Sequence, residues 1–470
     1  MATDGPTADA GAAGPPFNSL PLKPAIVANL ASLGFTRMTP IQAQALPPLL
    51  AGRDIIARAK TGSGKTAAFG LALINRLEVL SFATQALVLC PTRELADQVS
   101  KELRRLARST ANVKILTLCG GMPLGPQMGS LAHGCHIVVG TPGRIQEHLR
   151  KGSLALSQLA VLVLDEADRM LDMGFADAIA DIAGQLPSQR QTLLFSATYP
   201  EGIAAISKAY QHDPLMIAVD VSHDQQQIEQ LFFEIPSQHK PEALLRLLRH
   251  YRPRSALVFC ATKQSCQDLA ERLVSKGFSA LALHGDMEQK DRNEVLVRFA
   301  NQSCPLLVAT DVAARGLDVK DLEAVISFDL SRDPEVHVHR IGRTGRAGKT
   351  GLALSLCAPE DAPRALRIEE LTGMKATWAE LPADKPEGPA PQPAMITLSI
   401  DGGRKQKLRP GDILGALTGE AGLSAADIGK IDIFEFRAYV AVARHSARHA
   451  LQKLGTGKIK GRSFKARTLG

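Results

Sequence analysis

Short apolar segments, each followed by a turn and an amphipathic helical pattern, recur along the chain and constrain the fold more than any other feature. Such continuous apolar runs are typical of parallel strands that are covered on both faces. The helical patterns between them imply right-handed βαβ units, so we predict an α/β fold with two doubly wound parallel sheets. The first series of predicted strands is 54–57, 86–90, 136–139, 161–164 and 192–195. The second series is 256–260, 280–283, 306–309, 324–328 and 351–356.

The pattern also predicts domain boundaries. Polar residues interrupt it near 210–227, and a Pro-rich, polar linker occupies 379–393. The segment after this linker, which we call the tail, has a βαββαβ order typical of a small α+β module. Its predicted elements are 396–400, helix 412–417, 431–434, 437–442, helix 446–454 and 463–466. We predict a disordered leader at 1–16, then domains at 17–215, 216–378 and, for the tail, 394–470.

Several classes of protein are disfavoured by composition. No apolar run approaches the roughly 18 residues of a membrane helix, and the leader has neither the basic nor the apolar region of a signal peptide. The seven cysteines form no CxxC pair and their total is odd, which argues against a disulfide framework or a zinc site. We therefore expect a cytoplasmic protein with no membrane partner.

The net charge of +8 is unevenly distributed. The tail contains 14 Lys/Arg and 6 Asp/Glu, while the rest of the chain balances at 41 against 41. A compact basic module of this size favours an anionic partner such as nucleic acid. The alternative is an ordinary solvated basic surface.

A phosphate-binding loop follows the first predicted strand, with Ala in place of the usual first Gly and a helical pattern after it. Glycines there let backbone N–H groups approach phosphate oxygens at a helix N-terminus. Lys65 is placed to reach the β/γ-phosphates and Thr66 to ligate Mg²⁺. The loop consists of Ala59, Lys60, Thr61, Gly62, Ser63, Gly64, Lys65 and Thr66.

An acidic motif, Asp165-Glu-Ala-Asp168, follows the predicted strand 161–164. Ligands of open α/β sheets bind beyond the carboxyl ends of the strands, where this motif would lie with the phosphate loop. We expect Asp165 to hold the Mg²⁺ shell and Glu166 to orient or deprotonate the attacking water.

Other strand ends also have residues that suit phosphate. In the first series these are PTREL at 91–95, GTPGR at 140–144 and SAT at 196–198; in the second they are TDVAARGLD at 310–318 and, further on, HRIGRTGR at 339–346. Arg343 and Arg346 could supply arginine fingers to a hydrolytic site on the first domain. This predicts an enzyme that works only when its two halves close.

Together these motifs resemble the DEAD-box ATP-dependent RNA helicases of superfamily two, over about residues 17–376 and in the expected order. The resemblance implies two tandem RecA-like domains, ATP and Mg²⁺ as cofactors, and RNA as partner. GFTRMTPIQ at 34–42 resembles the family's Q motif, with Phe17 as its upstream aromatic residue. By resemblance, Gln42 would bind adenine and Asp318 the ribose. Ser196, Thr198 and His339 would couple the ATP state to RNA opening.

The resemblance also implies an RNA path over both domains, contacted chiefly through phosphates and sugars. Its residues would be Pro91, Thr92, Arg93, Gly121, Thr141, Gly143, Arg144, Thr262, Thr310 and Arg315.

The tail resembles the C-terminal RNA-binding domain of the bacterial DbpA subfamily, which implies recognition of a hairpin of large-subunit ribosomal RNA during ribosome assembly. It looks like a degraded RNA recognition motif, because one face of its third strand offers Arg437 and Tyr439 and its first strand offers Thr397 and Ser399. Instead of the sheet face, we expect the loop and helix edge to bind RNA; a generic charged loop is the alternative. The candidates are Arg404, Lys405, Lys407, Arg409, Lys430 and Arg437.

The leading function is an ATP-dependent RNA helicase that opens short duplexes locally and is directed by its tail to pre-ribosomal RNA. An ATP-switched RNA clamp without productive unwinding uses the same motifs and stays an alternative. A nucleotide kinase or a DNA translocase is disfavoured, because the second sheet has arginines and no second nucleotide loop follows. We expect a monomer with no obligate protein partner.

Overall fold

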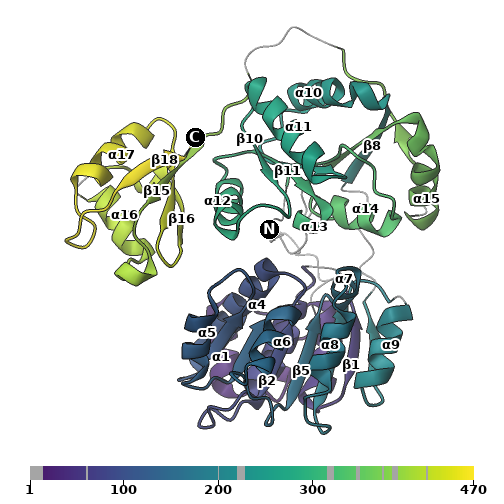
Figure 1. The fold of residues 1–470 in the computed structure, drawn as a ribbon, viewed down its shortest axis with the longest axis vertical. Coiled ribbons are helices and arrows are strands. Elements are labelled where there is room, and N and C mark those ends of the chain that lie inside the picture. Colours follow the sequence, from purple (N-terminus) through teal and green to yellow (C-terminus); the bar gives the residue numbers. More distant parts are fainter. Residues whose placement is uncertain are drawn as a thin grey trace, which may run out of the picture. The chain divides into compact units, whose positions relative to one another are not determined.

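The computed structural model describes residues 14–59, 62–199, 201–219, 228–314, 322–345, 350–372, 375–383, 390–419 and 422–469 (Figure 1). The chain divides into two compact units, one built on the first large sheet and the other on the second large sheet and the tail. Two parallel seven-stranded sheets and one antiparallel four-stranded sheet confirm the predicted fold class.

The first unit has a parallel sheet in the order β3-β4-β2-β5-β6-β1-β7. Its strands are β1 (Ile55–Arg58), β2 (Ala86–Leu89), β3 (Ile115–Leu118), β4 (Ile137–Gly140), β5 (Val161–Asp165), β6 (Gln191–Ser196) and β7 (Leu215–Ala218). Its helices are α1 (Pro24–Ser32), α2 (Pro40–Leu50), α3 (Lys65–Arg76), α4 (Arg93–Leu106), α5 (Leu124–Leu131), α6 (Pro142–Arg150), α7 (Ala167–Asp172), α8 (Ala176–Ala183) and α9 (Glu201–Tyr210).

Alternate residues of these strands enter two different hydrophobic cores, one on each face of the sheet. In β1, Ile55 and Ala57 pack with residues of α1 to α4, whereas Ile56 packs with residues of α6 to α9. Every residue of β2 and of β5 is buried. This two-sided burial is why the strands read as continuous apolar runs.

The second unit repeats this architecture, with the strand order β10-β11-β9-β12-β13-β8-β14. Its strands are β8 (Ile228–Glu234), β9 (Ala256–Cys260), β10 (Ala280–Leu283), β11 (Leu306–Thr310), β12 (Ala324–Ser327), β13 (Gly351–Cys357) and β14 (Thr377–Trp378). Its helices are α10 (Lys240–Tyr251), α11 (Lys263–Ser275), α12 (Gln289–Ala300), α13 (Asp311–Ala314), α14 (Pro334–Ile341) and α15 (Ala362–Thr372).

The tail has the predicted βαββαβ order and pairs its strands as β16-β17-β15-β18. Its elements are β15 (Met395–Ile400), α16 (Pro410–Thr418), β16 (Ile428–Ile433), β17 (Ala438–Ala443), α17 (Ala447–Thr456) and β18 (Ala466–Leu469). The last strand was placed too early in the sequence prediction, at 463–466. Phe464 instead packs into the tail core, and pairing with β15 begins only at Ala466.

Sequence patterns missed four strands: β3, β7, β8 and β14. Three of them lie at sheet edges, where one side has no neighbouring strand and the apolar run is short or interrupted. The residues of β7 are mostly exposed, and both residues of β14 are exposed. β8 is inside the sheet, but the polar pair Glu229 and Gln230 breaks its apolar run.

All seven cysteines are free and buried. Burial raises their thiol pKa values, to about 12 for Cys119 and Cys357. Across the described helices, none combines the length and apolar character needed to cross a membrane.

His337, on α14, is a buried histidine whose folded pKa differs from its ordinary value. Its ring lies 5.9 Å from that of Phe232, and neither ring nitrogen has a hydrogen-bond partner among the described residues. Burial lowers the pKa of His337 to about 4, and nearby Arg340 acts in the same direction. Because the folded pKa is depressed, the neutral ring favours the folded state above about pH 6.5, and this stability is lost as the pH falls toward 4.

We expect His337→Phe to stabilise the chain, and to do so more at pH 5 than at pH 7.5. The linkage contribution of His337 is at most about 2 kcal/mol at pH 5, and Phe removes it together with two buried polar atoms. Calorimetric unfolding at both pH values measures the difference, with exposed His133→Phe as the control. An equal gain at both pH values would contradict the assignment.

Candidate active site

The order of strands in the first sheet separates its motif loops into two groups. β5, β6 and β1 are neighbours, so the acidic motif, the 196–198 motif and the phosphate loop leave the sheet side by side. The predicted RNA residues follow β2, β4 and β3, which form the other part of the same sheet. One edge of the sheet thus has a predicted nucleotide half and a predicted RNA half.

The phosphate loop has the conformation that its glycines predict. Gly62 has φ +89° and Gly64 has φ +100°, values that L side chains rarely adopt. A Cβ atom on Gly64 would lie 2.5 Å from the Nε2 atom of Gln42. The buried Lys65 ammonium donates to the carbonyl of Ala59 at 2.8 Å. Lys60 and Thr61 lie outside the described residues.

Gln42 and Thr39 fasten the start of α2 to this loop. The Thr39 hydroxyl donates to the carbonyl of Ser63 at 2.8 Å, and Gln42 Nε2 donates to that of Gly64 at 3.2 Å. The Oε1 atom of Gln42 accepts from the Thr39 N–H at 2.9 Å. Phe17, also buried, packs edge-on against Phe35 with ring centroids 6.4 Å apart. The residues that resemble the Q motif therefore position the phosphate loop.

Asp165 lies at the end of β5 with its carboxyl group buried. Burial raises the pKa of Asp165 to about 7, although the Lys65 ammonium opposes the shift. Its Oδ1 atom has no hydrogen-bond partner among the described residues. A buried, unpaired carboxylate oxygen fits a divalent cation, and Mg²⁺ in nucleotide sites needs only one or two protein carboxylates besides phosphates and water. Asp165 thus suits the predicted Mg²⁺ site.

Glu166 is the next residue and has a left-handed backbone, with φ +54°. Its Oε2 atom accepts from Arg169 Nη1 at 2.6 Å, and both side chains are buried. Arg169 was not among the predicted site residues. Its spacing of three residues from Glu166 was the available signal, because such a pair meets on one helical face.

Asp168 connects the acidic motif to the 196–198 motif. Its Oδ2 atom accepts from the Ala197 N–H at 3.0 Å, the Thr198 N–H at 3.0 Å and the Thr198 hydroxyl at 3.1 Å. Burial alone would raise the pKa of Asp168, but Lys65, the Thr198 N–H and Arg169 outweigh it and hold the pKa below its ordinary value. Ser196, also buried, has a hydroxyl without a partner among the described residues.

In the RNA half of the edge, two side chains organise the loops. The Thr92 hydroxyl accepts from the Leu95 N–H at 3.2 Å and caps α4. The guanidinium of Arg93 lies against Gly121, where an added Cβ would be 1.8 Å from Nη1. Pro91 is buried beside them. Gly121 therefore leaves room for Arg93.

Arg144 is held from three sides and its side chain is only 9 % exposed. Its Nη1 donates to Gln127 Oε1 at 3.0 Å, its Nη2 to the carbonyl of Met122 at 3.0 Å, and its Nε pairs with Glu147 at 3.1 Å. This residue thus ties α5 to α6. Thr141 precedes α6, and the space where a Cβ of Gly143 would stand is open.

In the second sheet, β9 and β11 are neighbours and bring Thr262 and Thr310 to one edge. The Thr262 hydroxyl accepts from the Ser265 N–H at 3.1 Å, and that of Thr310 from the Ala313 N–H at 3.4 Å. Both hydroxyls therefore stabilise the start of a helix. Three predicted site residues of the second domain lie outside the described residues: Arg315, Asp318 and Arg346.

Arg340, which was not among the predicted site residues, anchors α14 to the sheet edge. Its Nε and Nη2 atoms each donate to Asp311 at 2.7 Å, and its guanidinium lies 4.8 Å from the centroid of the Phe259 ring. Arg343 is buried just beyond this helix, and His339, on the helix, is half-buried. Arg340 therefore fixes the segment that contains both residues.

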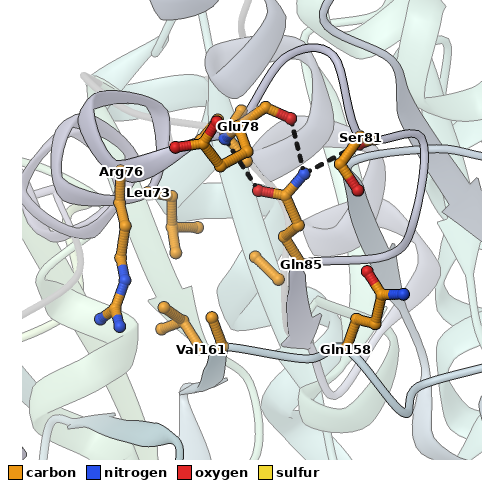
Figure 2. A pocket seen from close by; sticks show the side chains of 10 residues that line it. Leu73, Arg76, Glu78, Ser81, Gln85, Gln158 and Val161 are labelled. Atoms are coloured by element: carbon orange, nitrogen blue, oxygen red, sulfur yellow. Dashed lines mark hydrogen bonds between the residues drawn. The ribbon is translucent and has the colours of Figure 1, made fainter.

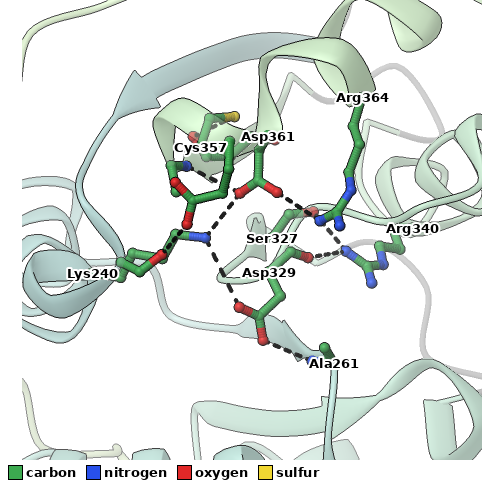
Figure 3. A network of polar contacts seen from close by, with 12 residues as sticks. Lys240, Ala261, Ser327, Asp329, Arg340, Cys357, Asp361 and Arg364 are labelled. Carbon is green, nitrogen blue, oxygen red and sulfur yellow. Dashed lines mark hydrogen bonds and ion pairs between the residues drawn. The ribbon is translucent and has the colours of Figure 1, made fainter.

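A second network of charged side chains lies at the same edge of the second sheet (Figure 3). Lys240 Nζ lies 3.3 Å from Asp361 Oδ2 and 3.9 Å from Asp329 Oδ1. The other oxygen of Asp329 accepts from the Ala261 N–H at 2.8 Å, directly before Thr262. This network positions the predicted RNA loop after β9.

The predicted RNA residues of the tail differ in their surroundings. Three of them pair with acidic groups: Lys405 with Glu435 at 3.3 Å, Lys430 with Asp432 at 3.4 Å and Arg437 with Asp401 at 3.3 Å. Arg437 precedes β17 rather than lying within it, because the strand begins at Ala438. The other three predicted RNA residues of the tail, Arg404, Lys407 and Arg409, are exposed.

The first unit also has a pocket of about 420 Å³ (Figure 2). It lies beside Ala86 and Val161, the first residues of β2 and β5. Gln85 closes one side, with its amide bonded to the backbone of Glu78 and Ser81. The pocket is therefore at the amino ends of the strands, opposite the motif loops.

Three family models match the chain: DEAD/DEAH box helicase over residues 39–206, helicase conserved C-terminal domain over 239–348, and DbpA RNA binding domain over 397–468. Together with the two parallel sheets and their loops, these matches define the class: the chain belongs to the DEAD-box family of ATP-dependent RNA helicases. It is 57 % identical to the ATP-dependent RNA helicase DbpA of Escherichia coli, across 95 % of this chain and 98 % of that protein.

More distant relatives match the helicase part. The DEAD-box ATP-dependent RNA helicase CshA of Geobacillus kaustophilus is 42 % identical, over 76 % of this chain and 77 % of its own. A solved structure of S. cerevisiae Dbp5 bound to RNA and ADP BeF3 is similar with a TM-score of 0.71 and 30 % identity, covering 78 % of this chain and 96 % of that one.

We expect Asp168→Asn to destabilise the first unit by about 1–3 kcal/mol. The amide oxygen can take the place of Oδ2, but the amide nitrogen then faces the Arg169 N–H, from which Asp168 Oδ1 accepts at 3.0 Å, and an NH₂ group cannot accept. Thermal unfolding at neutral pH, where the Asp168 carboxylate is charged, measures the loss. Exposed Asp177→Asn is the control. The double variant with Thr198→Ala should lose less than the sum of the single losses; strict additivity would contradict the coupling.

Proposed function

We propose that this helicase opens short RNA duplexes locally and that its tail directs it to a hairpin of large-subunit ribosomal RNA during ribosome assembly in the cytoplasm. The observation that carries the proposal is the tail, which matches an RNA-binding family and holds the whole net charge of +8. Neutralised phosphates supply affinity without sequence information, so a charged module must also contact bases to select one hairpin.

In the proposed cycle, Gln42 and Asp318 bind adenine and ribose, and Lys65 approaches the β/γ-phosphates. Mg²⁺, held by Asp165 and Thr66, would neutralise phosphate charge. Glu166 orients or deprotonates the attacking water while Arg169 fixes its carboxylate. Arg343 and Arg346 would stabilise the transition state as arginine fingers.

The effect of RNA binding would be transmitted to the nucleotide site through Asp168. A shift of residues 197 and 198 changes the three hydrogen bonds on its carboxylate, and Asp168 follows Glu166 by two residues. This contact supports the proposal that Ser196 and Thr198 couple the nucleotide state to RNA opening. Arg93, Arg144 and the Thr262 loop would hold the RNA backbone on the remaining strand ends.

Glu166→Gln should retain ATP and RNA binding and lose hydrolysis by about 10²- to 10⁴-fold, because an amide keeps the shape but is a poor base. RNA-stimulated phosphate release and nucleotide affinity are measured on the same preparation, with Glu102→Gln on α4 as the control. Near-normal turnover would remove Glu166 from the mechanism.

Replacing Lys405 and Lys407 with Glu should weaken binding of the ribosomal hairpin more than that of an arbitrary hairpin of equal length. The matched control reverses Arg448 and Lys453, which are exposed on α17 and change the net charge of the tail equally. Fluorescence anisotropy of the full chain at one fixed salt concentration gives all affinities. Equal loss for both RNAs would make this loop an electrostatic anchor only.

Strand displacement separates the proposed helicase from the alternative clamp. A clamp binds a short duplex in an ATP-dependent manner and leaves it paired. The helicase releases the shorter strand. Glu166→Gln should stop repeated rounds of strand release, because ATP hydrolysis is lost.

A further inference from the structure

The tail has one exposed aromatic side chain. Its four aromatic residues all lie in the described part of the chain, and Phe436 is 61 % exposed. Tyr439 is only 3 % exposed, Phe464 packs against the tail core, and Phe434 is half-buried. Phe436 occupies the turn between β16 and β17, so packing within the tail does not account for it.

The turn that presents Phe436 is braced by the loop after β15. The Arg404 N–H donates to the carbonyl of Phe434 at 2.8 Å, and the Lys405 N–H to that of Glu435 at 2.9 Å. Gly403 permits this approach, because a Cβ there would lie 2.4 Å from the Phe434 oxygen. The ring of Phe434 also packs edge-on against Tyr439, with centroids 5.5 Å apart. The exposed ring therefore projects from a fixed base.

Cationic side chains surround this base. Lys405 and Arg437 belong to the two joined segments, each beside one acidic partner. Arg404 is exposed and has no ion pair among the described residues. An exposed π-face with adjacent cations is the combination that single-stranded nucleic acid binds: bases stack on the ring and phosphates pair with the charges.

The sheet face of the tail is covered, so it cannot stack RNA bases. Thr397 Oγ1 accepts from Asn301 Nδ2 at 2.8 Å and lies 2.6 Å from the Ser303 hydroxyl, both in the loop after α12. Ser399 pairs with Tyr439 across β15 and β17, and both are buried. Burial raises the pKa of the Tyr439 phenol, and Glu294 on α12 adds to the shift. RNA recognition motifs stack bases on this sheet surface, which is covered here.

We propose that Phe436, with Arg404 and Lys405 beside it, is a stacking site for one unpaired RNA base. The inference deepens the proposed function, because it rests on RNA binding by the tail. Stacking on an aromatic face tolerates any base, so the site takes single-stranded RNA of any sequence in a loop, bulge or overhang. Such a site would distinguish a hairpin loop from a continuous duplex.

The test uses the full chain without nucleotide and an arbitrary-sequence hairpin that has 2-aminopurine in its unpaired loop. Phe436→Ala should weaken binding about 5- to 150-fold and abolish fluorescence quenching of the 2-aminopurine. Affinity for the same stem as a blunt-ended duplex should change less than twofold. Phe436→Tyr and Phe436→Trp should retain both signals, whereas Phe436→Leu, which is apolar without a π-face, should not.

Leu414→Ala, at an exposed apolar residue of α16, is the matched control and should leave both RNAs unaffected. Unchanged hairpin affinity in Phe436→Ala would overturn the proposal, as would equal loss on hairpin and duplex or full retention in Phe436→Leu. Because the hairpin has an arbitrary sequence, the stacking site can be confirmed even if the ribosomal target is wrong. It can likewise fail while that target is right.

Discussion

Parallel pairing of β5, β6 and β1 is the constraint on which the candidate active site depends. These strands are neighbours in space, although long stretches of chain separate them, and each ends in a motif loop. The registers that pair Asp165 with Phe195 and Arg58 with Ser196 align the ends of these strands. A slip in either pairing would separate the acidic motif, the 196–198 motif and the phosphate loop.

Two carboxylates three residues apart have pKa values shifted in opposite directions because their surroundings differ. Burial alone would raise the pKa of Asp168, but the Lys65 ammonium, the Thr198 N–H and Arg169 hold that pKa below its ordinary value. Asp165 lacks such donors on Oδ1, and burial raises its pKa to about 7. Hydrogen bonding therefore makes Asp168 a fixed structural link, while Asp165 suits a cation. The surrounding fold assigns different roles to two residues of one type.

In the second unit, ion pairs hold the motif loops in place, whereas in the first unit glycines allow the phosphate loop to take its conformation. Arg340 with Asp311, and Lys240 with Asp361 and Asp329, connect strand ends that are distant in sequence. Breaking one partner of such a pair leaves a buried charge, so these groups hold the edge rigidly. The tail uses Gly403 and backbone hydrogen bonds instead, which leaves Phe436 and the cations exposed.

The sequence alone determined the α/β class, the order of the motifs, most inner strands and the βαββαβ tail, because these depend on local apolar periodicity and on short contiguous motifs. Three edge strands of the large sheets, β3, β7 and β14, escaped prediction. In β7 and β14, exposure removes that periodicity. Arg169, Arg340 and Phe436 also escaped, since what distinguishes them is a partner or an exposure that no local pattern records. Only tertiary structure decided that Gln42 and Thr39 brace the phosphate loop, that Arg144 is enclosed and that the Thr397 face of the tail is covered. Burial and hydrogen-bond partners are set when segments distant in sequence pack together, and that packing is not encoded in any one segment.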